Sequence, residues 1–181
     1  MAFAKDFKSC HFLRATTFQD IDRQSGSKYL ESDSIPYGEI RNDLENGRTV
    51  LFTGLPCQTH AVCRKFREFN NLIVATLICN AVPSSKKWKA YIESLEKLHD
   101  SNVVGVNMRY NVRDIKYEFE TGETVVFSKD QCQWRKHWLY GNLTVRPSCV
   151  ICRYKYPNIF GDFIVGDGWG FDHLKPANAI K

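Results

Sequence analysis

The chain has 181 residues, of which 43% are hydrophobic and 13% aromatic, and this composition excludes an intrinsically disordered chain. Its net charge of +5 is spread along the sequence, and short basic clusters such as Lys86–Lys87 favour a solvated helix face over a nucleic-acid interface. No apolar run of about 18 residues predicts a membrane span, and residues 1–8 lack the long apolar core of a signal peptide. We therefore expect a cytoplasmic protein.

The seven cysteines point to metal or redox chemistry. Their number is odd and their spacing uneven, which disfavours a disulfide framework in a chain without an export signal. They are Cys10, Cys57, Cys63, Cys79, Cys132, Cys149 and Cys152.

The first 36 residues are the least regular part of the sequence. A short helix is expected to begin near Thr17–Asp22. The segment Gly26-Ser27-Lys28-Tyr29 follows, and its backbone N–H groups and ammonium could meet a phosphate, although a plain loop is the more common outcome for such a triplet.

Residues 37–78 predict a parallel βαβ unit. The spacing of residues 37–46 suits a helix that ends at Gly47, and the apolar run 49–53 is typical of a buried strand. A helix is expected over residues 57–69 and a second buried strand over 72–78. The two strands should be parallel and joined by a right-handed crossover.

This arrangement brings two cysteines to one sheet edge. Cys57 follows the first strand at the start of a helix, and Cys79 follows the second strand. Parallel strands end at the same edge, where open α/β folds build their sites, and a helix N-terminus favours the thiolate form of Cys57. Cys63, further along the helix, is expected to be a buried apolar side chain.

Residues 85–128 predict an antiparallel extension. A helix over 85–99 precedes a strand over 103–110, and residues 115–120 and 124–128 alternate as in a hairpin. The fold class expected is α/β, a mixed sheet with a parallel βαβ core and an antiparallel hairpin extension. Residues 131–140 are aromatic and basic, so they could stack on a ring or bind an anion, or simply form an amphipathic helix over the core.

The pair Cys149-x-x-Cys152 places two soft thiolates on one turn, close enough to bind a single metal centre. Two sulfurs do not complete a site, and the sheet-edge argument predicts Cys57 and Cys79 as the other two ligands. Four thiolates accept zinc as well as iron, so at this level the metal stays open.

Five segments together resemble a known family, the beta subunit of coenzyme F420 hydrogenases and dehydrogenases, chiefly its C-terminal domain. The segments are Gly26-Ser27-Lys28-Tyr29 with Ser32-Asp33, Gly54-Leu55-Pro56-Cys57-Gln58, residues 79–84, Arg146-Pro147-Ser148-Cys149-x-x-Cys152, and Gly161-Asp162 with Gly166-Asp167-Gly168-Trp169-Gly170. They occur in the family's order and spacing over residues 26–170.

Members of that family are cytoplasmic iron–sulfur flavoproteins that transfer electrons between a cluster, a flavin and a substrate or carrier. The resemblance implies Cys57, Cys79, Cys149 and Cys152 as ligands of one 4Fe-4S cluster. It implies Gly26, Ser27, Lys28 and Tyr29 as contacts of FAD. His60 is a possible proton donor near the cluster, with a surface histidine as the alternative, and no catalytic acid or base is assigned.

The sequence also departs from the family pattern. Asn80-Ala81 stands where the family usually has His-Gly, Leu55 replaces a threonine, and Gly168 replaces a phenylalanine. These changes keep the four thiols but alter the groups around them, and therefore the redox potential. The family's ferredoxin-like cysteine repeats have no counterpart here. We expect one domain over residues 1–181, with 1–36 a remnant of the family's N-terminal region and 37–175 its C-terminal domain.

Three functions compete. The first is an electron-transfer oxidoreductase subunit, with a redox partner that supplies ferredoxin-like clusters and a small-molecule electron acceptor or donor. The second is a non-enzymatic module with a structural zinc held by four cysteines. The third is a truncated, cofactor-free assembly subunit.

Overall fold

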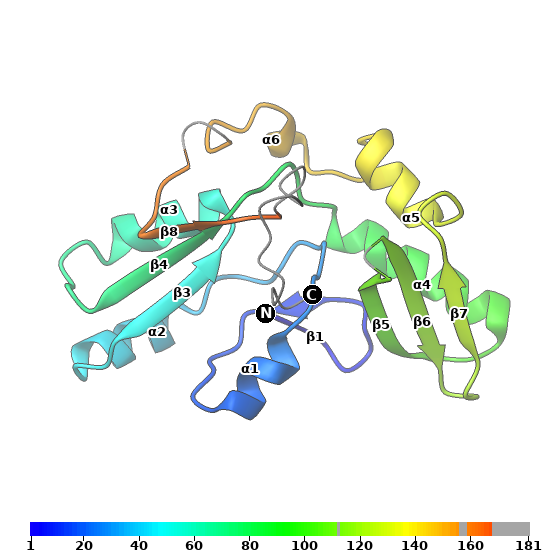
Figure 1. Cartoon of the computed structure of the whole chain (residues 1–181), viewed down its shortest axis with the longest axis horizontal. Helices are drawn as coiled ribbons and strands as arrows, with labels where there is room; N and C mark the ends of the chain where they lie inside the picture. The colour runs from blue at the N-terminus through cyan, green and yellow to red at the C-terminus, as the bar shows by residue number, and fades with distance from the viewer. Residues whose placement is uncertain (112, 156–158, 168–181) are drawn as a thin grey trace, which may run out of the picture. The chain divides into compact units, whose positions relative to one another are not determined.

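A computed structural model describes residues 1–111, 113–155 and 159–167 (Figure 1). The chain divides into two compact units, and each is discontinuous in sequence. Unit 1 consists of residues 1–36 and 81–152, and unit 2 of residues 37–80 and 153–181. A single domain with a boundary after residue 36 stays a prediction. None of the helices in the described ranges is long and apolar enough to cross a membrane.

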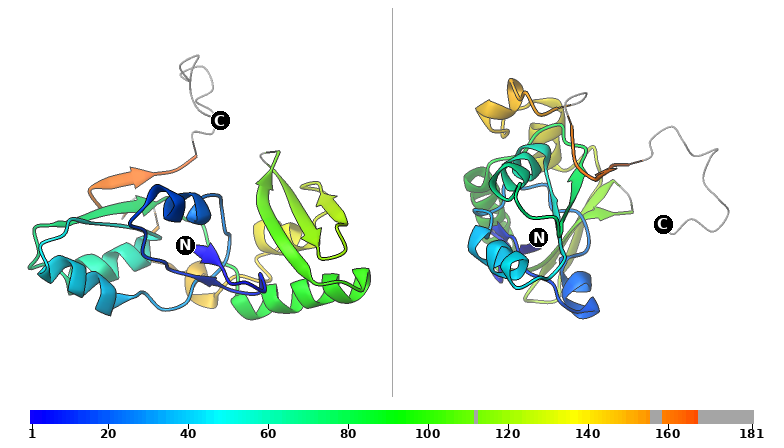
Figure 2. Two further views of the ribbon diagram at one scale, coloured as in Figure 1. Left: turned by 90° about the horizontal axis from the view of Figure 1, so that it is seen from below. Right: turned by 90° about the vertical axis from the view of Figure 1, so that its left-hand side faces the viewer.

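Unit 2 contains the predicted βαβ element. It consists of α2 (Tyr37–Glu45), β3 (Val50–Gly54), α3 (Pro56–Lys65), β4 (Leu72–Leu77) and β8 (Phe163–Val165). The sheet order is β3-β4-β8 and both pairings are parallel. Both α2 and α3 lie on one face of this sheet (Figure 2), where Phe52, Val62, Phe66 and Val74 are buried. Gly47 follows α2 with a φ of 73°, which explains why a glycine ends this helix.

The last strand of unit 2 is fixed to β4 by the loop that precedes it. The carboxylate of Asp162 accepts a hydrogen bond from the Val74 N–H at 2.7 Å, and the Thr76 hydroxyl donates to the Phe160 carbonyl at 2.7 Å. Gly161 has a φ of 154°, and a Cβ on it would lie 2.7 Å from Thr76 Oγ1. The Gly161-Asp162 motif therefore has a structural role: it aligns β8 beside β4.

Unit 1 is built around an antiparallel sheet of β5 (Val103–Tyr110), β6 (Asp114–Phe119) and β7 (Thr124–Phe127), in that order. Helix α4 (Ser85–His99) covers one face of this sheet (Figure 2). Trp88 and Ile92 of α4 are fully buried with Tyr117 of β6, and the Trp88 indole donates to the Phe7 carbonyl at 2.7 Å. The apolar stripe predicted for residues 85–99 is thus the core of unit 1.

The expected fold class is confirmed: the fold is α/β, with a parallel βαβ element and an antiparallel hairpin. The sheet arrangement differs from the expected one. The hairpin strands β6 and β7 form a separate sheet with β5 instead of extending the parallel sheet. The physical reason is the large apolar face of α4, which is buried against β5 and β6, so these strands complete a separate core.

The remaining described elements of unit 1 are short. Thr17 caps one of them, α1, in a capping box: its hydroxyl accepts from the Asp20 N–H at 3.2 Å, and the Asp20 carboxylate accepts from the Thr17 N–H at 3.1 Å. These elements are β1 (Ala2–Phe3), β2 (Cys10–His11), α1 (Phe18–Gln24), α5 (Gln133–Arg135), the π-helix η1 (Lys136–Tyr140) and α6 (Pro147–Val150).

Candidate metal centre

Cys57 lies in the first turn of α3, and its thiol is exposed. The turn is shaped by its neighbours in the Gly-Leu-Pro-Cys-Gln motif. Pro56 occupies the first helical position, and Gln58 Oε1 accepts from the Leu55 N–H at 2.9 Å. A Cβ on Gly54 would lie 2.8 Å from the Phe52 ring and 3.3 Å from Gln58 Oε1, so only glycine fits there. The helix N-terminus favours an anionic sulfur at this position.

Cys79 is half-buried and follows the end of β4. In the parallel register Gly54 is paired with Thr76. Cys57 follows Gly54 by three residues, and Cys79 follows Thr76 by three residues. Both cysteines therefore lie at the carboxyl edge of the same sheet. Unit 2 thus has the parallel sheet edge that the sequence predicted for these two cysteines. That the two cysteines bind the same metal stays a prediction.

Cys149 and Cys152 belong to unit 1, and both are half-buried. Cys149 lies in α6, where its N–H donates to the Arg146 carbonyl at 2.9 Å. The Arg146 side chain pairs with Glu31 at 3.2 Å, which fixes the turn that carries the two thiols to the N-terminal segment of unit 1.

A short antiparallel ladder precedes this turn. Pro83 is bridged to Val145, the Ser84 N–H donates to the Thr144 carbonyl at 2.7 Å, and the Arg146 N–H donates to the Val82 carbonyl at 3.1 Å. Residues 82–84 and 144–146 are thus held side by side within unit 1. Cys79 precedes the first of these segments by three residues, and Cys149 follows the second by three residues.

The predicted ligands are therefore divided two and two between the units. Within residues 1–111, 113–155 and 159–167, no three or more histidine, cysteine, aspartate or glutamate side chains form a group that could hold a metal ion. The chain passes from unit 2 to unit 1 after Asn80 and returns after Cys152. Cys79, Cys149 and Cys152 all lie within four residues of these two crossings.

The other three cysteines have different surroundings. Cys10 and Cys132 are fully buried in the apolar core of unit 1. Burial raises the pKa of Cys10 to about 12, so its thiol stays protonated at neutral pH. Burial also raises the pKa of Cys63 in α3. Cys10 and Cys132 behave as small apolar side chains. Cys63, which the sequence predicts to be buried, is only half-buried, because its position on α3 lies at the margin of the face that carries the buried Val62.

In the segment predicted to contact a flavin, the ammonium of Lys28 is bound by backbone carbonyls of the same chain segment. Lys28 Nζ donates to the carbonyls of Gln24 at 2.8 Å and Gly26 at 3.0 Å, and also to the carbonyl of Ser25. These bonds cap the end of α1, and burial lowers the pKa of Lys28. The ammonium therefore binds backbone carbonyls of its own segment in place of a phosphate.

Tyr29, the last residue of that segment, packs against an aromatic ring of η1. The Tyr29 and Trp138 ring centroids are 4.6 Å apart, and the Tyr29 N–H points to Met108 Sδ at 3.1 Å. The aromatic and basic segment predicted as a ring or anion site is thus next to the predicted flavin segment within unit 1.

His60, the possible proton donor, packs between two aromatic side chains of unit 2. Its ring centroid is 4.9 Å from that of Tyr154 and 5.5 Å from that of Phe160. This packing fits a structural histidine. Of the last family segment, Gly168, Trp169 and Gly170 lie outside the described residues.

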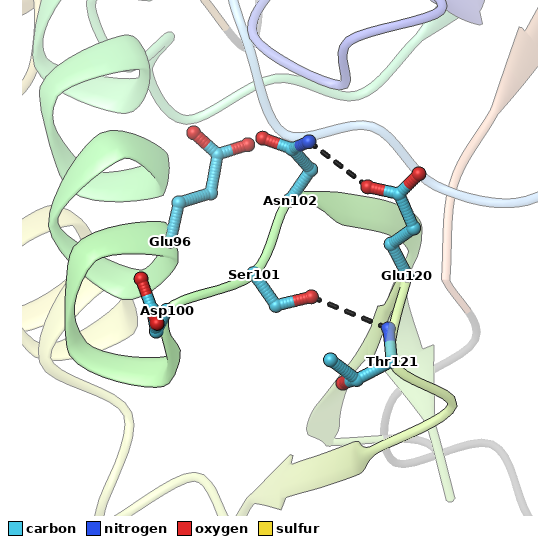
Figure 3. Close-up of a pocket in the computed structure, with 6 residues that line it drawn as sticks. All are labelled: Glu96, Asp100, Ser101, Asn102, Glu120 and Thr121. Atoms are coloured by element: carbon cyan, nitrogen blue, oxygen red, sulfur yellow. Dashed lines mark hydrogen bonds between the residues drawn. The ribbon is translucent and has the colours of Figure 1, made fainter.

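A pocket of about 470 Å³ between α4 and β6 is acidic (Figure 3). Two of its three carboxylates have partners: Glu96 pairs with Lys8 at 2.8 Å and accepts from the Val103 N–H, and Glu120 accepts from Asn102 at 3.0 Å. These bonds hold the end of α4 to the sheet, so the pocket is a feature of the scaffold.

Sequence reasoning misses two residues. The sequence identifies Asp162 only as part of a motif, and its bond to β4 depends on a contact 88 residues away. Arg135 is only one member of a basic cluster in the sequence, yet it is buried and its Nη1 has no hydrogen-bond partner in the described structure. Neither property leaves a local signal in the sequence.

Comparison with known proteins gives a fold and a family. No curated protein sequence matches this chain at a significant level. The F420-reducing [NiFe] hydrogenase complex from Methanosarcina barkeri contains a chain that is similar in fold, with a TM-score of 0.52 and 19% sequence identity. The match covers 85% of this chain and 52% of that one, so this chain spans about half the length of its structural neighbour.

A family match agrees with this likeness in fold. Residues 47–178 match the family described as the C terminus of the coenzyme F420 hydrogenase/dehydrogenase beta subunit. This range contains the Gly-Leu-Pro-Cys-Gln motif, all four predicted ligands and the Gly161-Asp162 loop. The chain belongs to the coenzyme F420 hydrogenase/dehydrogenase beta subunit family, through its C-terminal region.

Proposed function

We propose that this chain is the iron–sulfur part of an electron-transfer oxidoreductase, with Cys57, Cys79, Cys149 and Cys152 as ligands of one 4Fe-4S cluster. The observation that carries the proposal is the position of the cysteines along the fold. Three of them flank the two points where the chain crosses between its compact units. Metal binding at these cysteines would contribute directly to folding free energy.

Chain connectivity supports a shared site. Residues 82–84 and 144–146 are paired in unit 1, and a chain extends at most about 3.5 Å per residue. Cys79 and Cys149 are each three residues from this ladder, so the length of chain allows both thiols to reach one metal centre. Cys57 joins Cys79 through the register of β3 and β4.

The donor set fits the proposed group. All four are thiols with exposed or half-buried side chains, whereas Cys10 and Cys132 are fully buried. Thiolates are the ligands that iron–sulfur clusters use, and a cluster supplies one-electron transfer. The chain contributes in two ways: the first turn of α3 favours an anionic sulfur at Cys57, and the ion pair of Arg146 with Glu31 fixes the turn before Cys149.

A flavin is the proposed partner of the cluster, and FAD is the form that family membership favours. The ammonium of Lys28 does not fit a phosphate contact, because it caps the end of α1. Contacts from this segment would come from the backbone of Gly26 and Ser27 and from the ring of Tyr29. Flavins exchange electrons singly or in pairs, so a small-molecule acceptor or donor of two electrons completes the proposal.

We also propose that the chain acts with a redox partner. The chain that it resembles in fold is part of the F420-reducing [NiFe] hydrogenase complex. A partner protein would supply the ferredoxin-like clusters. A reducing, cytoplasmic location is proposed as well, because the site needs its cysteines as thiols.

Metal and sulfide analysis of anaerobically purified protein tests the proposal. We expect about four irons and four acid-labile sulfides per chain, with broad visible absorbance that bleaches on reduction. Cys57→Ser and Cys149→Ser should each lower the iron content severalfold. Cys63→Ser is the matched control, since Cys63 lies in the same helix as Cys57 and should leave the iron content unchanged. One zinc per chain without sulfide would contradict the redox function and favour a structural module.

A further inference from the structure

His60 lies one helical turn after a proposed metal ligand. It belongs to α3, which also carries Cys57 in its first turn. Side chains three residues apart on an α-helix lie on one side of it, with their Cβ atoms about 5–6 Å apart. A contact that fixes the His60 ring therefore acts close to Cys57.

One of the rings that contact His60 follows a second proposed ligand. The centroids of the His60 and Tyr154 rings are 4.9 Å apart, at an interplanar angle of 42°. Tyr154 is two residues after Cys152, and a chain extends at most about 3.5 Å per residue, so their Cα atoms are within about 7 Å of each other. Cys152 is the last residue of unit 1, but only Arg153 separates it from Tyr154. The ring contact therefore limits the distance between the chain positions of Cys57 and Cys152.

The same histidine also contacts a segment that is bound to β4. The centroids of the His60 and Phe160 rings are 5.5 Å apart, and the rings meet edge-on at 83°. The Phe160 carbonyl accepts from the Thr76 hydroxyl at 2.7 Å, and Thr76 is three residues before Cys79. Because Thr76 is fully buried in β4, this contact gives the His60 ring a fixed support.

Buried hydroxyls hold the first turns of α3 to the same strand. Thr59, the residue before His60, is fully buried, and its Oγ1 is 3.0 Å from Thr76 Oγ1. The Thr59 hydroxyl also lies within hydrogen-bond distance of the Leu55 and Pro56 carbonyls, at 3.2 Å and 3.1 Å. The helix that carries Cys57 and His60 is therefore a firm base against which a second ring can pack.

Two other ring contacts of unit 2 lie further from the proposed ligands along the chain. They join Phe66 to Tyr37 at 6.1 Å and to Phe69 at 6.2 Å between centroids. Phe66 is fully buried, so these contacts belong to the core of unit 2. His60 and Tyr154 are only half-buried, so their contact contributes less to that core and its position beside the two cysteines is its distinguishing feature.

We propose that His60 and Tyr154 are positioning residues of the metal centre, whose ring contact holds Cys152 near Cys57. The proposal rests on the function proposed above, in which both cysteines bind one cluster. Neither ring is a ligand. The contact raises the effective concentration of one thiol near the other, because it closes most of the long loop between them before the metal binds.

Disulfide formation in the metal-free full chain tests the position of the two thiols. A background with Cys79→Ser and Cys149→Ser leaves Cys57 and Cys152 as the remaining proposed ligands. Diamide then oxidises them to a disulfide, and mass spectrometry of the linked peptides measures the rate. His60→Ala should slow this reaction about threefold to tenfold, the range expected for the loss of one aromatic pair. His60→Phe keeps a ring at this position and should restore the rate.

Tyr154→Ala removes the same contact from a residue outside α3, so it should slow the reaction equally and provides the test if His60→Ala fails to fold. The double variant should be no slower than either single variant, because both substitutions remove one contact. Phe69→Ala is the matched control, since it removes a ring contact beyond the other end of α3 and should leave the rate unchanged. No disulfide in the background chain, an unchanged rate in the alanine variants of His60 and Tyr154, equal slowing in Phe69→Ala, or no recovery in His60→Phe would each overturn the proposal.

Iron loss separates this proposal from the proposed function. In the iron-loaded full chain with its cysteines intact, His60→Ala and Tyr154→Ala should lose iron to a chelator about threefold to tenfold faster than the wild type, and His60→Phe should match the wild type. If the wild type binds iron and the alanine variants lose it at the same rate, the function stands and the positioning role is wrong. If the wild type binds neither iron nor sulfide, the proposed function fails, and the disulfide rates still decide whether the two rings position the thiols.

Discussion

Replacement of Asp162 by alanine should release β8 from the parallel sheet. The Asp162 carboxylate accepts from the Val74 N–H at 2.7 Å, and Val74 is fully buried. A hydrogen bond to a charged acceptor contributes about 1.5–3 kcal/mol, and because Asp162 itself is exposed we expect about 1–2 kcal/mol. The three residues of β8 are each 48–59% exposed, so little apolar burial holds the strand once this bond is lost.

Amide hydrogen exchange is the direct assay. The Ile78 N–H donates to the Val165 carbonyl at 2.8 Å, so this amide and that of Val74 report whether β8 is in place. A loss of about 1–2 kcal/mol should speed their exchange roughly 5- to 30-fold. Asp162→Asn keeps an acceptor and should have an intermediate effect, and Asp130→Ala, an exposed control, should have none. Unchanged exchange at both amides in Asp162→Ala would refute the assignment.

Two further predictions concern stability. Gly161→Ala should destabilise the protein by about 1–3 kcal/mol, because the added Cβ would lie 2.7 Å from Thr76 Oγ1 and 3.1 Å from the Val74 carbonyl. Urea denaturation measures this change in the free energy of unfolding, and a change near zero would show that the loop can relax. Burial raises the pKa of Cys10 from 9.0 to about 12. As the pH rises, the unfolded chain therefore loses the thiol proton before the folded chain does. The stability that the protonated, buried thiol contributes is lost between about pH 9 and pH 12. The wild type should therefore lose up to about 1.4 kcal/mol per pH unit more than Cys10→Ala in this window, in urea titrations at each pH, and parallel pH profiles would contradict the burial of this thiol.

Local pattern is sufficient to predict the regular elements. Helix α4 has its predicted bounds, because Trp88, Ile92 and Leu95 recur at helical spacing and the stripe is long enough to be unambiguous. The parallel pair β3 and β4 is predicted for a similar reason, since two short apolar runs flank one helix and the crossover rule leaves a single arrangement.

Long-range and local side-chain geometry could not be predicted. Strand β8 has only three residues, and its place depends on Asp162 reaching Val74, 88 residues earlier in the chain. Lys28 resembles a free cation in the sequence, but Gly26 adopts a φ of 80° and the ammonium turns back to three carbonyls. Periodicity does not encode either arrangement.

The candidate site is only partly within reach of sequence reasoning. The sheet edge for Cys57 and Cys79 could be predicted because it follows from strand direction alone. The division of the four cysteines between two compact units could not, since it depends on which residues pack together after the chain leaves β4. The buried state of Arg135 was also hidden, because basic residues are exposed in most helices.

The alternation of the chain between its two units has a consequence for synthesis. Unit 2 begins at residue 37 but receives β8 only at residues 163–165, after all of unit 1 has been made. On a ribosome, the parallel sheet must therefore wait as a two-stranded fragment while the antiparallel sheet forms from strands that are adjacent in sequence. We expect unit 1 to fold first and the edge of β4 to stay open until residues 160–165 emerge.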